Sequence, residues 1–196
     1  MISIELMFYL AVGLFGGIGA IRGWQKEVIA MAGLIGSIAF LHRFGPVVIR
    51  VGSPVVTFLS GTESAGLRET FWVQFLFILT IAFFSYQIIG SITDRTGRRD
   101  LRNGFQNGFT GFIIGLINGY LLFGTLWSFL EYQIVGEEYA RLGADVNFFA
   151  PYVDRSASVA AIFPEVINYL PLAIFNPGVW LLVFFLSFFV VIIALV

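Results

Sequence analysis

The chain has 196 residues, 58% of them hydrophobic and 12% charged, and its mean hydropathy is +0.90. A soluble domain is about 45–50% apolar and about 25% charged, so this composition indicates a membrane protein. The formal net charge of -1 gives no basic field for nucleic acid, which is not expected as a partner. There is no cysteine, which excludes disulfides, thiol chemistry and cysteine-bound metals.

Residues 4–21 form the first predicted membrane helix. No basic residue precedes this apolar run and Arg22 follows it, which is the reverse of a cleaved signal peptide. We therefore expect a retained helix with an external N-terminus. The second predicted helix covers residues 27–43 and ends at His42 and Arg43, whose polar ends can reach the membrane surface.

Residues 44–70 are predicted to be an external loop. Two similar pieces, PVVIRV and PVVTFL, begin at Pro46 and Pro54 and are too short and too broken to span a membrane. They fit either a re-entrant or interfacial segment or a kinked continuation of the second helix, and the sequence does not separate these alternatives.

The third and fourth predicted helices, 71–93 and 103–130, are long enough to span a bilayer. Residues 131–177 follow as a second, acidic external loop, part of which is expected to be an ordered loop or an element lying on the outer membrane surface. Residues 178–196 are the candidate for a fifth helix. The chain stops inside this apolar run, which suggests truncation.

Basic residues in short loops set the orientation, because they favour the cytoplasmic side. Arg22 and Lys26 lie in the first turn, and four arginines lie within 94–102. Both turns are predicted to be cytoplasmic. The expected fold class is all-α: residues 1–196 form a single membrane domain, a polytopic helical bundle with four to five transmembrane helices.

The stretch GFIIGLINGY, residues 111–120, places glycines at a regular spacing in an apolar helix. At 100° per residue, five glycines fall within an arc of about 80°. They are Gly104, Gly108, Gly111, Gly115 and Gly119. Helices in lipid associate through close backbone contact, which small residues permit.

Matching small faces are expected on the first helix at Gly13 with Gly17 and at Gly19 with Gly23. On the second helix they are expected at Ala32 with Gly36 and at Gly33 with Ser37. The prediction is glycine-rich close packing of helices 1, 2 and 4. A self-association face, or a pore lined by backbone, is the alternative use of the same glycines.

Polar residues near these helices give two further predictions. Asn107 and Asn118 lie about 20° apart at the edge of the glycine arc and should hydrogen-bond to a neighbouring helix, or border a wet path together with Gln87. In the cytoplasmic turn, Gly23 separates Arg22 from Glu27. These charges form either a structural clamp or a site for a partner or lipid headgroup.

An enzyme is not expected. His42 is the single histidine, so a histidine metal cluster is excluded, and the chain has no phosphate loop, GxSxG elbow or HExxH pair. We expect no cofactor and no metal.

Two stretches carry a family resemblance. AIRGWQKEVIAMAGLIG, residues 20–36, and GFIIGLING, residues 111–119, make residues 1–130 resemble the CvpA family of bacterial colicin V production proteins. Asn107 and Asn118 stand where that pattern often has an acidic residue and an arginine. The resemblance implies a multi-pass protein of the bacterial inner (cytoplasmic) membrane linked to production or export of this toxin.

Together these features predict a non-enzymatic membrane scaffold or accessory. Its expected partners are the lipid bilayer, an unidentified membrane or secretion protein, and further copies of itself. The alternative is an oligomeric passive channel or export component in the same membrane.

Overall fold

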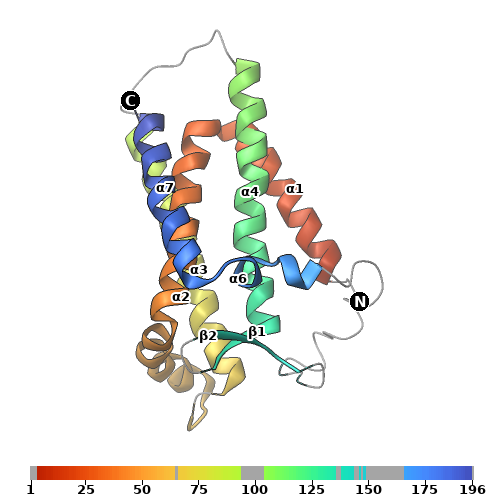
Figure 1. Cartoon of the computed structure of the whole chain (residues 1–196), viewed down its shortest axis with the longest axis vertical. Coiled ribbons are helices and arrows are strands. Elements are labelled where there is room, and N and C mark those ends of the chain that lie inside the picture. The colour runs from red at the N-terminus through yellow and green to blue at the C-terminus, as the bar shows by residue number, and fades with distance from the viewer. Residues whose placement is uncertain are drawn as a thin grey trace.

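The computed structural model describes residues 4–64, 66–93, 104–135, 138–143, 146, 148 and 166–195. Within these residues the protein is an all-α helical bundle with one small β hairpin (Figure 1). The predicted basic turn 94–102 and residues 149–165 of the predicted second loop lie outside the described residues.

Five longer helices form the bundle: α1 (Ile4–Arg22), α2 (Trp24–Ser60), α3 (Leu67–Thr93), α4 (Gly104–Glu131) and α7 (Pro177–Leu195). Four of them, α1 to α4, contain stretches long and apolar enough to cross a membrane. The fifth predicted helix is present as α7, whose apolar stretch Pro177–Ile193 is shorter. The chain is therefore a multi-pass membrane protein.

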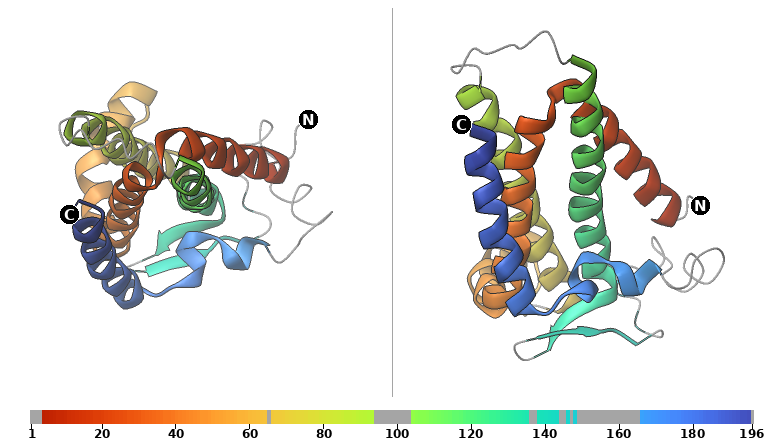
Figure 2. Two further views of the ribbon diagram at one scale, coloured as in Figure 1. Left: turned by 90° about the horizontal axis from the view of Figure 1, so that it is seen from above. Right: turned by 45° about the horizontal axis from the view of Figure 1, so that its top comes forward.

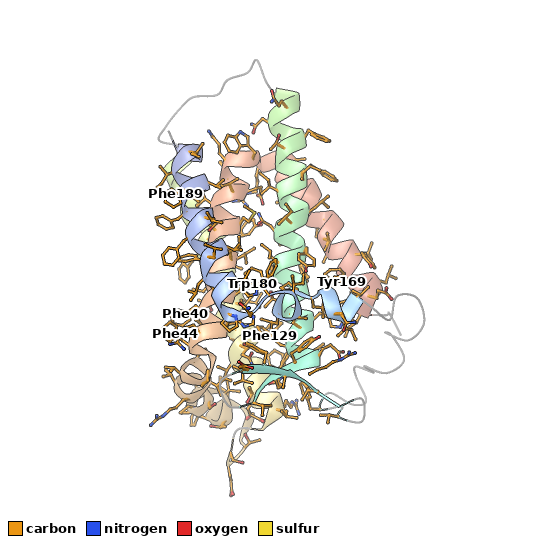
Figure 3. The ribbon with its side chains drawn as sticks, viewed as in Figure 1. Phe40, Phe44, Phe129, Tyr169, Trp180 and Phe189 are labelled. Carbon is orange, nitrogen blue, oxygen red and sulfur yellow. The ribbon has the colours of Figure 1, made fainter. Side chains whose placement is uncertain are left out.

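The central helix of the bundle is α2, which packs against α3, α7 and α4. By contrast, α1 packs mainly along α4 at one side of the molecule (Figure 2). The largest core cluster includes Leu34 and Ile38 from α2, Ile78 from α3 and Phe129 from α4. Phe129 points into the bundle (Figure 3) and is fully buried.

A single residue, Gly23, joins α1 to α2. Its φ of 84° lies in the region that residues with a side chain rarely adopt, so glycine is required for this reversal. The backbone amide of Gly23 donates a hydrogen bond to the carbonyl of Gly19 at 2.9 Å, which closes the last turn of α1. The chain therefore reverses between two membrane helices without a loop.

The predicted loop 44–70 is wrong for most of its length, because α2 continues through Pro46 and Pro54 to Ser60. The kinked-continuation alternative is the one that the structure supports. Packing compensates for the lost backbone bonds, since an added Cβ on Gly52 would lie 2.6 Å from Val73 of α3. The segment after Pro46 turns away from the bundle axis (Figure 2), as expected for a proline kink.

The predicted second loop, 131–177, contains regular structure at both ends. Strands β1 (Tyr132–Val135) and β2 (Glu138–Arg141) pair antiparallel, and η2 (Val166–Tyr169) and α6 (Pro171–Ile174) precede α7. The hairpin lies across the end of the bundle where α2 and α3 are joined (Figure 1). Its strands are too short for the sequence pattern to distinguish them from a loop.

Glycines let the backbones of α1 and α4 touch. A Cβ added to Gly115 would lie 3.0 Å from the Cα of Gly19 and closer still to a carbonyl oxygen of α1. Gly111 and the carbonyl of Gly19 meet in the same way. Gly108 and Gly119 also face α1, so four of the five glycines in the predicted arc line this contact.

Of the two small faces predicted on α1, one meets α4. Gly19 and Gly23 both lie against Gly111, as predicted, whereas Gly13 and Gly17 have nothing within 4 Å of an added Cβ. A glycine spacing of four occurs on more than one face of α1, and only the position of α4 selects between them. Gly104 also has nothing within 4 Å.

Gly36 of the second helix does not pack against the helices that were predicted. Gly36 faces Phe184 of α7, with 2.7 Å between an added Cβ and the phenyl ring, and does not face α1 or α4. The contact between α2 and α4 is made instead by larger apolar side chains such as Leu34 and Leu121, together with the polar groups described next.

Candidate functional site

The carboxylate of Glu27 lies at the centre of a polar cluster inside the bundle. Glu27 is in the first turn of α2 and its side chain is fully buried. Arg22, the last residue of α1, donates a hydrogen bond from Nη1 to Oε1 of Glu27 at 2.9 Å. A buried carboxylate is costly unless it is paired, so this ion pair compensates the charge. The predicted clamp between Arg22 and Glu27 is present.

Two further helices contribute donors to the same carboxylate. The hydroxyl of Tyr86 on α3 donates to Oε2 of Glu27 at 3.1 Å. Asn118 on α4 donates from Nδ2 to Oε2 at 2.7 Å and to the backbone carbonyl of Glu27 at 3.0 Å. We call Arg22, Glu27, Tyr86 and Asn118 the Glu27 cluster. It joins α1, α2, α3 and α4 at one point.

Arg22 is held by more than its ion pair. Its Nη2 donates to the backbone carbonyl of Tyr86 at 3.2 Å, and the guanidinium lies over the Tyr86 ring with 4.4 Å to the centroid. The ring of Phe15 packs edge-on against the same tyrosine, at 5.7 Å between centroids. The position of the Arg22 guanidinium beside Glu27 is therefore fixed both by hydrogen bonds and by the packing of Tyr86 and Phe15.

Asn107 of α4 lies outside the Glu27 cluster, next to the N-terminus of α2. Its Oδ1 accepts a hydrogen bond from the backbone amide of Trp24 at 3.1 Å. This satisfies one of the amides that a helix leaves unpaired at its N-terminus, a role usually taken by the residue before the helix. Here that residue is Gly23, which has no side chain, and α4 supplies the cap instead.

The hydrogen bonds predicted between Asn107 or Asn118 and a neighbouring helix are present, while the alternative, a polar path that also includes Gln87, is not assembled. Gln87 is exposed on α3 and is not part of the Glu27 cluster. The neighbouring Tyr86 points inward in its place. The error arose because the prediction ranked helix 3 residues by polarity and passed over a tyrosine, whose hydroxyl is polar while its ring suits an apolar interior. Tyr86 is near the C-terminal end of α3 and Glu27 is near the N-terminal end of α2, so both lie at the same end of the bundle. This shared depth in the membrane was a usable signal.

A second polar contact lies at the opposite end of the bundle. The hydroxyl of Tyr139 on β2 donates to Oε1 of Gln74 on α3 at 2.7 Å. Burial raises the pKa of Tyr139, so the hydroxyl stays protonated and remains a donor. Tyr139 also packs edge-on against the ring of His42, at 5.1 Å between centroids. These contacts attach the hairpin to α2 and α3.

Comparison with protein-family models, with curated proteins and with solved structures gives no match for this chain. The resemblance to the CvpA family therefore rests on the sequence pattern. Among the described residues there is also no group of three or more histidine and acidic side chains arranged to hold a metal ion.

Replacing Tyr86 by phenylalanine should remove one hydrogen bond to Glu27 and leave the aromatic contacts in place. We expect the free energy of unfolding to fall by about 1.5–3 kcal/mol, as for a hydrogen bond to a charged group. The measurement is denaturant-induced unfolding in detergent micelles. Gln87→Ala on the same helix is the matched control and should change little. Equal stability of the two variants would contradict the role given to the Tyr86 hydroxyl.

Proposed function

We propose that this protein is a membrane scaffold or accessory, without chemistry of its own, that supports colicin V production or export in the bacterial inner membrane. The link to colicin V comes from the resemblance of residues 20–36 and 111–119 to the CvpA family. The proposed orientation, with an external N-terminus, comes from the basic residues of the turns.

The observation that carries the scaffold proposal is the Glu27 cluster. Its carboxylate receives donors from three other helices, and Glu27 and Asn118 are both fully buried. A buried carboxylate that accepts hydrogen bonds from three other helices favours one arrangement of those helices, although Oδ1 of Asn118 has no partner among the described residues. A fixed arrangement suits a protein whose task is to present a constant surface to partners in the membrane.

The second candidate, an oligomeric passive channel, is favoured by one different observation. Gly13 and Gly17 lie one turn apart on α1 and face open space. Small residues at this spacing allow close packing of a further helix, which a second copy of the chain could supply.

Deletion and complementation test the scaffold proposal in a bacterium that secretes colicin V and carries this gene. Deletion should reduce secretion of the toxin, and the wild-type gene should restore it. The purified protein, reconstituted in liposomes, should then give no more ion or small-osmolyte flux than empty liposomes.

Two glycine variants separate the candidates. Gly115→Leu should fail to restore secretion because it disrupts the fold, and Gly17→Leu should restore it. Flux through the wild-type protein that Gly17→Leu abolishes, with the variant still folded, would replace the scaffold by an oligomeric channel. Unchanged secretion after deletion would overturn the link to colicin V.

A further inference from the structure

A pocket lies where α2 leaves the thickness of a bilayer. At a rise of about 1.5 Å per residue, α2 advances about 30 Å between Trp24 and Arg43, which is the thickness of the hydrocarbon core. His42 and Arg43 therefore lie at the level of the lipid headgroups. Pro177, the first residue of α7, and Glu138 of β2 border the same pocket.

The pocket encloses about 270 Å³ and carries both signs of charge. Its lining residues are His42, Arg43, Pro46, Val47, Glu138 and Pro177. Arg43 and Glu138 are both exposed, and in the part of the chain that the structure describes they are not within 4 Å of each other as an ion pair. Each charge is therefore open to an external group of opposite sign.

His42 lines the pocket and fixes part of its wall, while one polar atom of its ring is buried without a partner among the described residues. Its side chain is only 7% exposed, and Nε2 has no hydrogen-bond partner among the described residues. Buried polar atoms in folded proteins almost always have a partner. The imidazole is held between the rings of Tyr139 and Trp180, so it cannot easily turn to find one elsewhere.

An apolar face leads from the pocket toward the middle of the bilayer. Phe44 and Phe40 are both exposed and lie one turn apart on one side of α2, with Phe40 nearer to the middle of the bilayer. The two rings pack together at 4.9 Å between centroids at the surface of the bundle (Figure 3), and Phe40 also stacks on Phe77 of α3 at 5.6 Å. This face is placed to contact an acyl chain.

We propose that this pocket binds the headgroup of phosphatidylethanolamine. The phosphate lies against Arg43 and the ammonium against Glu138, and an acyl chain runs along Phe44 and Phe40. The volume is just below the usual range for small-molecule sites, about 300–1,000 Å³, which suits a headgroup whose tails stay outside.

Three matched lipids test the proposal on the full chain. The protein is reconstituted in nanodiscs of phosphatidylcholine containing a small fraction of phosphatidylethanolamine, or of phosphatidylglycerol, with identical acyl chains. Lipid retained on the protein after extraction is then measured by native mass spectrometry. We expect phosphatidylethanolamine to be retained about tenfold over phosphatidylcholine, whose trimethylated nitrogen cannot donate a hydrogen bond to Glu138.

Two variants assign the charges. Glu138→Gln should abolish the preference for phosphatidylethanolamine over phosphatidylcholine, and Arg43→Gln should reduce retention of all three phospholipids. Arg50→Gln is the control, because Arg50 is an exposed arginine on the same helix that does not line the pocket. It should retain lipid like the wild type.

Three outcomes would overturn the proposal. They are equal retention of the two zwitterionic lipids by the wild type, an unchanged preference in Glu138→Gln, and equal effects of Arg43→Gln and Arg50→Gln. Free phosphoethanolamine is tested separately in pure phosphatidylcholine nanodiscs. If it raises the melting temperature as much as the lipid does, the ligand is a soluble zwitterion and the lipid assignment fails. None of these readouts depends on colicin V secretion.

Discussion

Replacing Gly115 by leucine should separate α1 from α4 and lower the free energy of unfolding by about 3 kcal/mol, the upper end of the range for overpacked interiors. The reason is steric. An added Cβ would already lie 3.0 Å from the Cα of Gly19, and backbone cannot move aside as the end of a side chain can. The leucine side chain would force the two helix axes apart along their whole contact.

The matched control is Gly17→Leu, which adds the same side chain to α1 where nothing lies within 4 Å. Its stability should stay within about 0.5 kcal/mol of the wild type, as for a surface substitution. Denaturant unfolding in detergent measures both variants. Equal loss of stability in the two leucine variants would show that the glycine contact does not hold α1 in place.

Replacing Glu27 by alanine should lower the free energy of unfolding by about 3–5 kcal/mol, the usual cost of removing one partner of a buried ion pair. The substitution leaves Arg22 without its carboxylate. It also leaves the hydroxyl of Tyr86 without its acceptor in an apolar interior, while Asn118 keeps only its bond to the backbone carbonyl of residue 27. Glu27→Gln keeps the shape and one acceptor oxygen, so its loss should be smaller.

A double-mutant cycle isolates the ion pair from the effect of lost packing. Arg22→Ala and Glu27→Ala should together cost less than the sum of the two single changes, with a coupling of about 1–3 kcal/mol. Gln25→Ala, an exposed residue in the same turn of α2, is the control and should be neutral. Strict additivity of Arg22→Ala and Glu27→Ala would mean that the pair contributes nothing beyond its separate residues.

The membrane helices were predictable because each must contain an apolar run long enough to cross the lipid bilayer, and such a run is visible in the sequence. The full length of α2 was not predictable. Its hydropathy indicates where it leaves the membrane, and its prolines indicate where a regular helix should end, so both signals predicted an end before Ser60. Neither rule includes the contacts of Gly52 with Val73, which form only when α3 is in place.

The candidate site was predictable in part for a similar reason. Arg22 and Glu27 are close in sequence, so a turn alone brings them together. The positions of Tyr86 and Asn118 depend on the rotation of α3 and α4 about their axes, which a single sequence does not specify. The same limit explains why the sequence offered two small faces on α1, Gly13 with Gly17 and Gly19 with Gly23, without indicating which of them meets the glycine arc of α4.

The Glu27 cluster also has a consequence for how the chain enters the membrane. Arg22 and Glu27 are five residues apart, so their pair can form as soon as the first two helices have left the ribosome. The bond from Asn118 to Glu27 spans 91 residues and must wait for the fourth helix. Glu27 therefore enters the membrane already paired with Arg22. The pair lowers the desolvation free energy of the carboxylate before α3 and α4 pack around it.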